Sequence, residues 1–222
     1  MTGISVHIRT LNLRTSLEVE LTKMRSSVAA LGARVALAEL AGCGDLQADT
    51  AASDQTAVSA ASVARGDRAP LVALYFGAAW CGPCQQFSPE LARFARTAAA
   101  RSSLQVVFVS ADESSAAAES FARGKGFLAV PHDASDARRA ITNALNIRAY
   151  PTLIVLDTRS KKVVTRWGRA AISMEKQDGE VVREWLAGRG MNLQMIVSRP
   201  ARIGLVCIIL TALVILVRRL FF

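Results

Sequence analysis

Two cysteines separated by two residues, Cys81 and Cys84, are the side chains best suited to chemistry in this sequence, within the segment Trp80-Cys81-Gly82-Pro83-Cys84. They stand between an apolar run and a stretch of helical spacing. A thiol in the first turn of a helix ionises more readily, because unpaired N–H groups and the helix dipole favour negative charge there. The thiolate is the form that attacks disulfides. The spacing also brings the second sulfur within bonding reach of the first, which predicts a dithiol that cycles with a disulfide.

Two other uses of the pair are a half zinc site and a static disulfide. A zinc site needs two further ligands, and His7 and His132 are far from the pair and from each other in the sequence. A static disulfide is disfavoured in the cytosol, where thiols are kept reduced. The sequence therefore favours redox catalysis without a metal. Cys43 and Cys207 are interpreted as incidental.

Strands and helices are expected to alternate around this pair. The apolar runs that predict strands are Leu71–Phe76, Leu104–Val109 and Thr152–Leu156, followed by the more polar Lys162–Trp167. Helices are expected directly after the cysteines, with a kink at Pro89, and at Ser114–Arg123, Asp136–Leu145 and Asp178–Gly188. This order predicts an α/β domain with a central mixed β-sheet flanked by helices on both faces.

The C-terminal end carries an uncharged apolar run, Ile203–Val217, with two arginines on each side. As a helix it spans about 22 Å against roughly 30 Å of hydrocarbon, a mismatch that snorkelling arginines reduce. A buried core helix would show a polar face, and this run shows none. We expect residues 203–222 to form a single C-terminal transmembrane tail anchor after a basic linker at residues 191–202. The catalytic domain then faces the cytosol from the mitochondrial outer membrane or the endoplasmic reticulum.

Residues 1–55 are expected to form an N-terminal extension and linker ahead of a domain at residues 56–190. Arg34 interrupts the apolar stretch that an export signal needs, and Glu18 and Glu20 argue against a mitochondrial transit peptide. The expected structures are a helix over Leu17–Leu40 and a loop over Gly42–Ser62.

Charge and composition narrow the function classes. The chain of 222 residues has 27 Lys+Arg against 18 Asp+Glu, a net charge of +9, and it is 51% hydrophobic, enough for a folded core. Four of the arginines flank the C-terminal apolar run, and no aromatic residues are interleaved with clustered cations. Nucleic acid is therefore not an expected partner, whereas a membrane is.

Three stretches resemble the tryparedoxins, which are trypanothione-linked relatives of thioredoxin, and nucleoredoxin. These stretches are LYFGAAWCGPCQQFSPEL around the cysteines, VVFVSADE with the later FLAVP, and VVTRWGRAAI with DGEVVREW. Together with Tyr150-Pro151-Thr152 before a strand, they imply a thioredoxin-like fold over roughly residues 56–187. They also imply a thiol–disulfide oxidoreductase with no cofactor besides a redox-active disulfide of Cys81 and Cys84.

The resemblance implies roles for individual residues. Cys81 is the exposed nucleophile and Cys84 the resolving thiol, while Pro151 lies against the sulfurs behind a cis bond. The residues that support the site are Trp80, Gly82, Pro83, Tyr150 and Pro151. The residues that match acidic or basic positions facing substrate or trypanothione are Asp112, Glu113, Arg166 and Arg169.

Two departures from the tryparedoxin pattern leave the reductant open. The motif is WCGPC where tryparedoxins carry WCPPC, and Tyr150 replaces the usual Ile or Val before the cis-proline. Trypanothione is the expected reductant, glutathione and a thioredoxin reductase are the alternatives, and peroxiredoxin-type peroxidases are the expected clients. A different class, a nucleoredoxin-like redox-sensing adaptor, would bind a partner in one oxidation state with negligible turnover.

Overall fold

A single mixed sheet organises the computed structural model, which describes residues 24, 27–48, 58–174 and 179–190. Its strand order is β2-β1-β5-β4-β3-β6-β7. Central strand β3 (Leu71–Gly77) runs parallel to β4 (Leu104–Ser110) and antiparallel to β6 (Thr152–Asp157). The remaining strands are β5 (Leu128–Ala129), β7 (Lys162–Thr165), β1 (Asp45–Ala48) and β2 (Val58–Ser59).

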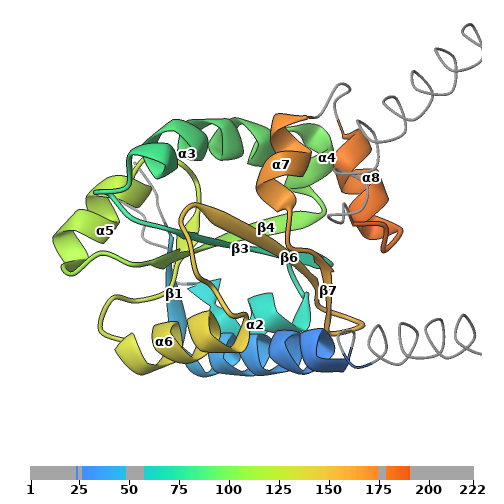
Figure 1. Ribbon diagram of the computed structural model, residues 1–222, viewed down its shortest axis with the longest axis horizontal. Helices are drawn as coiled ribbons and strands as arrows, with labels where there is room; N and C mark the ends of the chain where they lie inside the picture. The colour runs from blue at the N-terminus through green and yellow to red at the C-terminus, as the bar shows by residue number, and fades with distance from the viewer. Residues whose placement is uncertain (1–23, 25–26, 49–57, 175–178, 191–222) are drawn as a thin grey trace, which may run out of the picture.

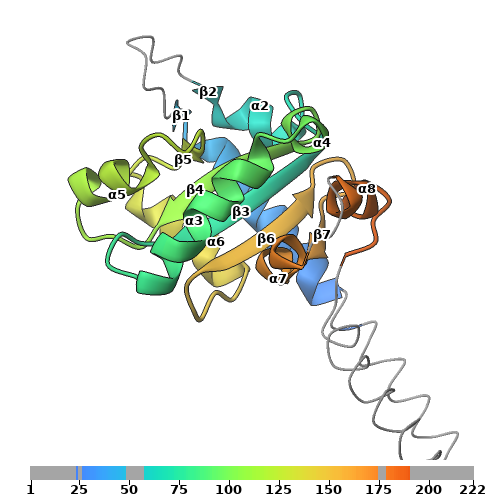
Figure 2. The same ribbon diagram turned by 90° about the horizontal axis from the view of Figure 1, so that it is seen from above.

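Helices cover both faces of the sheet, as Figures 1 and 2 show. On one face lie α3 (Gly82–Ala95), α4 (Ala98–Arg101), α7 (Gly168–Ser173) and α8 (Glu180–Leu186), with α5 (Ser115–Ala122) beside α3. On the other face lie α2 (Ala60–Arg65), α6 (Ser135–Ala144) and a helix through residues 27–42. The expected mixed sheet with helices on both faces is therefore confirmed.

Strand β3 is buried on both sides, because successive side chains of a strand point to opposite faces. Leu71, Ala73 and Tyr75 enter the core shared with the cysteines. Val72, Leu74 and Phe76 enter a second core, under α6 and the helix through residues 27–42. The strand thus ends between two rigid layers, and the chain that leaves it leads directly into Cys81.

The structure differs locally from the elements expected from the sequence. The loop predicted for Gly42–Ser62 is wrong at residues 45–48, which pair as β1 with β2 and β5, and at residues 58–62, which belong to β2 and α2. Leu46 is buried and Asp45 is exposed, and backbone pairing with β2 and β5 holds β1 without an apolar run. Helix α7 and the short strand β5 are further elements that were not expected.

Within the described residues, no helix is long and apolar enough to cross a membrane. The predicted anchor at residues 203–222 and the linker at residues 191–202 lie outside the described residues. The anchor therefore stays a prediction.

Candidate active site

Cys81 is the N-cap residue of α3, directly after the loop that follows β3. Its Sγ accepts a hydrogen bond from the Cys84 N–H at 3.3 Å, and its carbonyl accepts one from the same N–H at 2.9 Å. Pro83 occupies the first turn, where a helix has no use for its missing N–H. The placement of the cysteine pair at a strand-to-helix junction is confirmed. An N–H donor on Sγ stabilises negative charge at this sulfur.

Cys81 and Cys84 are joined as a disulfide, with their Cα atoms 5.2 Å apart. Cys84 is fully buried, whereas Cys81 keeps 7% of its surface exposed. Cys81 is thus less open than an exposed nucleophile would be, because it packs into the core cluster beside α3 while bonded to Cys84. Any molecule that attacks this disulfide from solvent meets Cys81 first.

Two aromatic side chains lie beside the disulfide at the surface. Trp80 is 64% exposed, and its ring meets the ring of Tyr150 edge-on with centroids 6.1 Å apart. The bond from Tyr150 to Pro151 is cis, as the resemblance implied. Trp80 and Tyr150 therefore form an aromatic rim, while contact between Pro151 and the sulfurs stays a prediction.

A polar contact set that the sequence did not reveal lies beneath Cys84. The hydroxyls of Ser88 and Tyr75 both donate to the Cys84 carbonyl, at 2.7 and 3.3 Å. Gly77 has no side chain here, and a Cβ on it would lie 3.1 Å from the Tyr75 hydroxyl and 3.4 Å from the Cys84 sulfur. The one available signal was Ser88 itself, a hydroxyl among the apolar residues of α3.

Burial raises the pKa of Tyr75 to about 12. The ring is fully buried and packs against Phe87 and Phe108. Tyr75 is therefore neutral at physiological pH and acts as a fixed hydrogen-bond donor under the disulfide, not as a proton acceptor.

We expect Tyr75→Phe to flatten the alkaline loss of stability. The tyrosine of the unfolded chain ionises near pH 10, while the folded one stays neutral up to about pH 12. Its contribution to stability is thus complete below about pH 10 and is lost as pH rises toward 12. Urea unfolding at several pH values in this window measures the slope. Equal slopes in the variant and the wild type would contradict the prediction.

Asp112 and Glu113, predicted together as acidic contacts, are placed very differently. Asp112 is 5% exposed, and its two carboxylate oxygens accept hydrogen bonds from the Ala79 N–H and the Ser110 hydroxyl, both at 2.8 Å. Ala79 lies two residues before Cys81, so this carboxylate fastens the cysteine loop to the end of β4. Glu113 is exposed. Of the two, Asp112 is built into the support of the loop, and only Glu113 is free to meet a ligand.

The structure also places Arg166 and Arg169 in different surroundings. Arg166 donates to the Leu145 carbonyl at 2.6 Å, at the end of α6, and burial lowers its pKa. Arg169 is exposed on α7, with its guanidinium 5.9 Å from the centre of the Phe87 ring of α3. Its charge also acts on the Tyr75 hydroxyl. Arg169 is thus the basic residue brought toward the disulfide, whereas Arg166 is engaged on α6.

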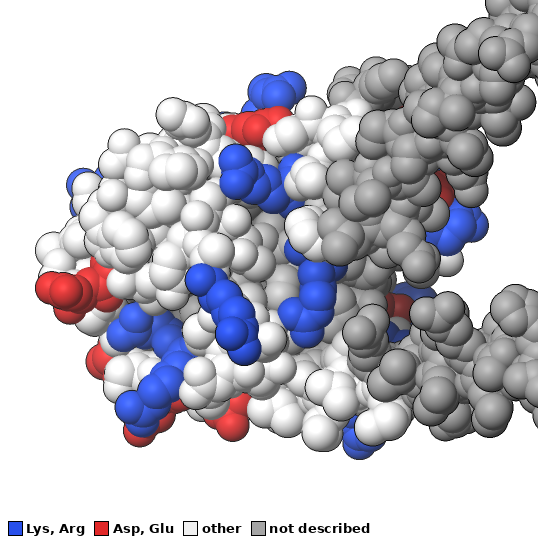
Figure 3. All heavy atoms as spheres, viewed as in Figure 1, with Lys and Arg blue, Asp and Glu red and all other residues white. Residues whose placement is uncertain are grey.

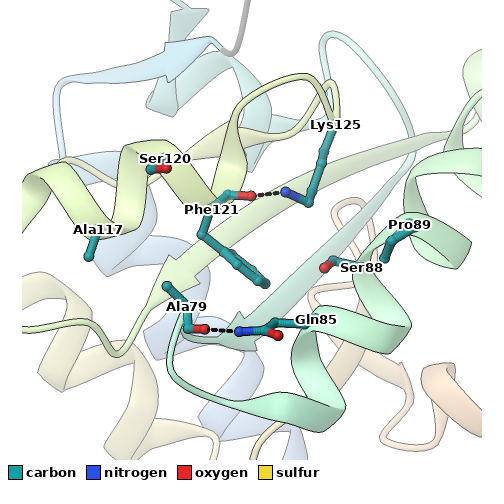
Figure 4. Close-up of a pocket in the computed structure, with 8 residues that line it drawn as sticks. All are labelled: Ala79, Gln85, Ser88, Pro89, Ala117, Ser120, Phe121 and Lys125. Atoms are coloured by element: carbon teal, nitrogen blue, oxygen red, sulfur yellow. Dashed lines mark hydrogen bonds between the residues drawn. The ribbon is translucent and has the colours of Figure 1, made fainter.

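Two hollows adjoin the site. The larger, about 370 Å³, lies between α3 and α5 (Figure 4). Gln85 donates to the Ala79 carbonyl at 2.6 Å across one end, and Lys125 donates to the Phe121 carbonyl across the other. The smaller, about 200 Å³, lies on the other face of the sheet and is lined in part by Tyr150 and Arg138. Neither cysteine lines either of these two hollows.

The described residues hold no group of three or more His, Cys, Asp or Glu that could bind a metal ion. Figure 3 shows basic side chains scattered among uncharged surface and acidic side chains on the described part of one face. The absence of a metal cofactor and of a nucleic-acid partner both stay predictions.

Comparisons with known proteins agree with this geometry. A family model described as thioredoxin-like matches residues 70–163. The chain is 30% identical over 140 residues to probable nucleoredoxin 1 of Arabidopsis thaliana, covering 59% of this chain and 24% of that protein. It is 29% identical over 108 residues to tryparedoxin of Trypanosoma brucei brucei, covering 49% of this chain and 74% of that protein. The crystal structure of tryparedoxin I from Crithidia fasciculata superposes with a TM-score of 0.56 at 31% identity, covering 64% of this chain and 92% of that one. The chain spans about a quarter of the length of the nucleoredoxins it matches.

Proposed function

We propose that this chain, which belongs to the thioredoxin family and is related to nucleoredoxin and tryparedoxin, reduces protein disulfides through Cys81 and Cys84. The observation that carries the proposal is the disulfide at the start of α3. One of its sulfurs belongs to a residue that reaches the surface, and the other to a residue that is completely buried. Such asymmetry supports attack on a client by Cys81 and release of the client by Cys84.

The cycle follows from this arrangement. In the reduced pair, the Cys81 thiolate attacks a client disulfide, forms a mixed disulfide and expels one client thiolate. The Cys84 thiolate then attacks the Cys81 sulfur, which releases the second client thiol and forms the Cys81–Cys84 disulfide. A dithiol reductant donates two electrons to this disulfide and returns both cysteines to the thiol form. The N–H of Cys84 stabilises the Cys81 thiolate at the start of each cycle.

Trypanothione is the reductant we propose, and peroxiredoxin-type peroxidases are the proposed clients. The likeness to tryparedoxins from two organisms, at 29% and 31% identity, supports the reductant. Exposed Glu113 follows Asp112, which holds the cysteine loop, and exposed Arg169 lies over the Phe87 ring of α3. Charges of both signs suit a reductant that carries amines and carboxylates. Residues 203–222 are proposed to hold this domain at the cytosolic face of a membrane.

The donor assay tests this proposal on the full chain in detergent. Reduction of insulin disulfides is measured with trypanothione and its reductase, with glutathione and its reductase, and with thioredoxin reductase. Rapid turnover with trypanothione supports the proposal as stated. Turnover only with thioredoxin reductase replaces the proposed reductant by that enzyme, and no turnover with any donor refutes the disulfide reductase.

The second candidate is a redox-sensing adaptor, which the likeness to nucleoredoxin over 140 residues favours. An adaptor would bind a partner protein in one oxidation state and show negligible turnover in the same assay. Binding of a partner by the reduced chain but not by the oxidised chain, together with negligible turnover in the insulin assay, would establish this alternative.

Trp80→Ala is expected to weaken recognition of protein clients without unfolding the domain. The side chain is 64% exposed, so its loss removes little core packing. An exposed Trp at the rim is typical of the residues that dominate binding to another protein, and we expect KM for insulin to rise about tenfold. The matched control is Trp167→Ala, which removes an exposed Trp after β7. Equal KM increases in both variants would contradict the prediction.

A further inference from the structure

The helix through residues 27–42 has two apolar faces, of which only one is used within the chain. Its inner face packs into the second core through Ala33, Ala36, Leu37 and Leu40. Its outer face carries Val28, Leu31 and Val35, which are 69%, 62% and 36% exposed, and helical residue Met24, before residues 25–26, is 63% exposed. They make up four of the eight exposed large hydrophobic residues of the described chain. An apolar stripe concentrated on one helix in this way calls for a partner.

The spacing of this stripe is that of a coiled-coil seam. Met24, Val28, Leu31 and Val35 are separated by four, three and four residues, the heptad alternation that keeps one seam facing a partner helix. The same alternation extends upstream in the sequence to Leu21 and Leu17. In this register Val28 and Val35 occupy a positions, and Met24 and Leu31 occupy d positions. β-Branched residues at a with Leu at d favour two strands.

We propose that the outer face of this helix pairs in parallel with the same helix of a second copy of this chain. The charged residues that flank the stripe favour a second copy as the partner and a parallel direction of pairing. Arg34 falls at a g position and Glu39 at the next e position. A parallel pair places Arg34 opposite Glu39 of the partner subunit, on both sides of the dimer. An antiparallel pair would place g positions opposite g positions and lose both attractions.

The sheet lies away from the seam, and the end of α6 approaches the flank of the helix at Gly32, an e position where a Cβ would meet the Ala144 carbonyl. The inner and outer residues lie on different sides of one helix, so the sheet does not obstruct the seam. The helix lies on the same face as α2 and α6, while α3 and its disulfide lie on the opposite face (Figure 1). Pairing through this helix therefore leaves both disulfides accessible to clients.

Single-cysteine variants of the full chain test the pairing. Cys43, Cys81, Cys84 and Cys207 are replaced by Ser, and Met24→Cys or Leu31→Cys is added singly. The purified chain in detergent is treated with a short bismaleimide. A parallel dimer places each residue beside its own copy, so both variants are expected to give a covalent dimer. Arg101→Cys, exposed on α4, is the matched control and is expected to stay monomeric.

Exchanging the charges of Arg34 and Glu39 distinguishes the proposed pairing from non-specific association of chains in detergent. In the Leu31→Cys background, Arg34→Glu is expected to reduce the cross-linked fraction several-fold, and adding Glu39→Arg is expected to restore it. Dimers that form equally in the Arg101→Cys control, or that ignore the charge exchange, would overturn the proposal. Chains that stay monomeric but bind anionic lipid vesicles through Val28 and Leu31 would overturn it in favour of a membrane-facing helix.

Discussion

Cys81→Ser is expected to lower the rate of disulfide reduction by at least about a thousandfold, because it removes the sulfur that begins the attack. Cys84 is completely buried and cannot replace it. Cys84→Ser is expected to fail one step later, since Cys81 can still attack but nothing resolves the mixed disulfide. Intact mass spectrometry after mixing with an oxidised client then shows a covalent adduct with Cys84→Ser and none with Cys81→Ser.

The control for both variants is Cys43→Ser. Cys43 is the free cysteine of the described residues; it donates to the Glu39 carbonyl, and burial raises the pKa of its thiol. A raised pKa leaves little thiolate at neutral pH, so this substitution is expected to leave turnover unchanged. Adducts that form equally in Cys81→Ser and Cys84→Ser would show that the two sulfurs are interchangeable. That result would refute the order of steps.

The strand-to-helix junction was predictable because its signals are local. The apolar run of β3 ends at Gly77, and helical spacing begins within the motif, so the cysteines had to lie at the start of a helix. Burial on both faces explains why β3, β4 and β6 appeared as continuous apolar runs. Strand β1 was not predicted because its partners give no strong signal in the sequence. Strands β2 and β5 are each two residues long, and β5 also lies far from β1 in the sequence.

The support of the site was not predictable, because it depends on contacts between distant segments. The pattern of the sequence treats Asp112 and Glu113 alike, as two acids after a strand. Only the three-dimensional arrangement brings the Asp112 carboxylate to the Ala79 N–H, 33 residues earlier in the chain. Arg166 and Arg169 differ for the same reason, since α7 carries Arg169 to the face of α3 while Arg166 reaches α6.

Asp112→Ala is expected to lower the free energy of unfolding by about 2–4 kcal/mol. The substitution removes both acceptors at once, which leaves the Ala79 N–H and the buried Ser110 hydroxyl without their partner, and each such group costs about 1–3 kcal/mol. Urea denaturation measures the loss. Because Ala79 belongs to the loop that leads into Cys81, turnover is expected to fall as well, even at temperatures where the variant stays folded.

Glu113→Ala provides the comparison within the same pair of acids. Its side chain is exposed, so its removal is expected to change stability by no more than about 0.5 kcal/mol. If Glu113 contacts the reductant, KM for trypanothione rises in this variant while the free energy of unfolding stays constant. Asp112→Ala is expected to have the opposite effect, with a large loss of stability and a lower kcat. Equal stability losses in the two variants would mean that the Asp112 carboxylate does not hold the cysteine loop, and the positioning role assigned to it would fail.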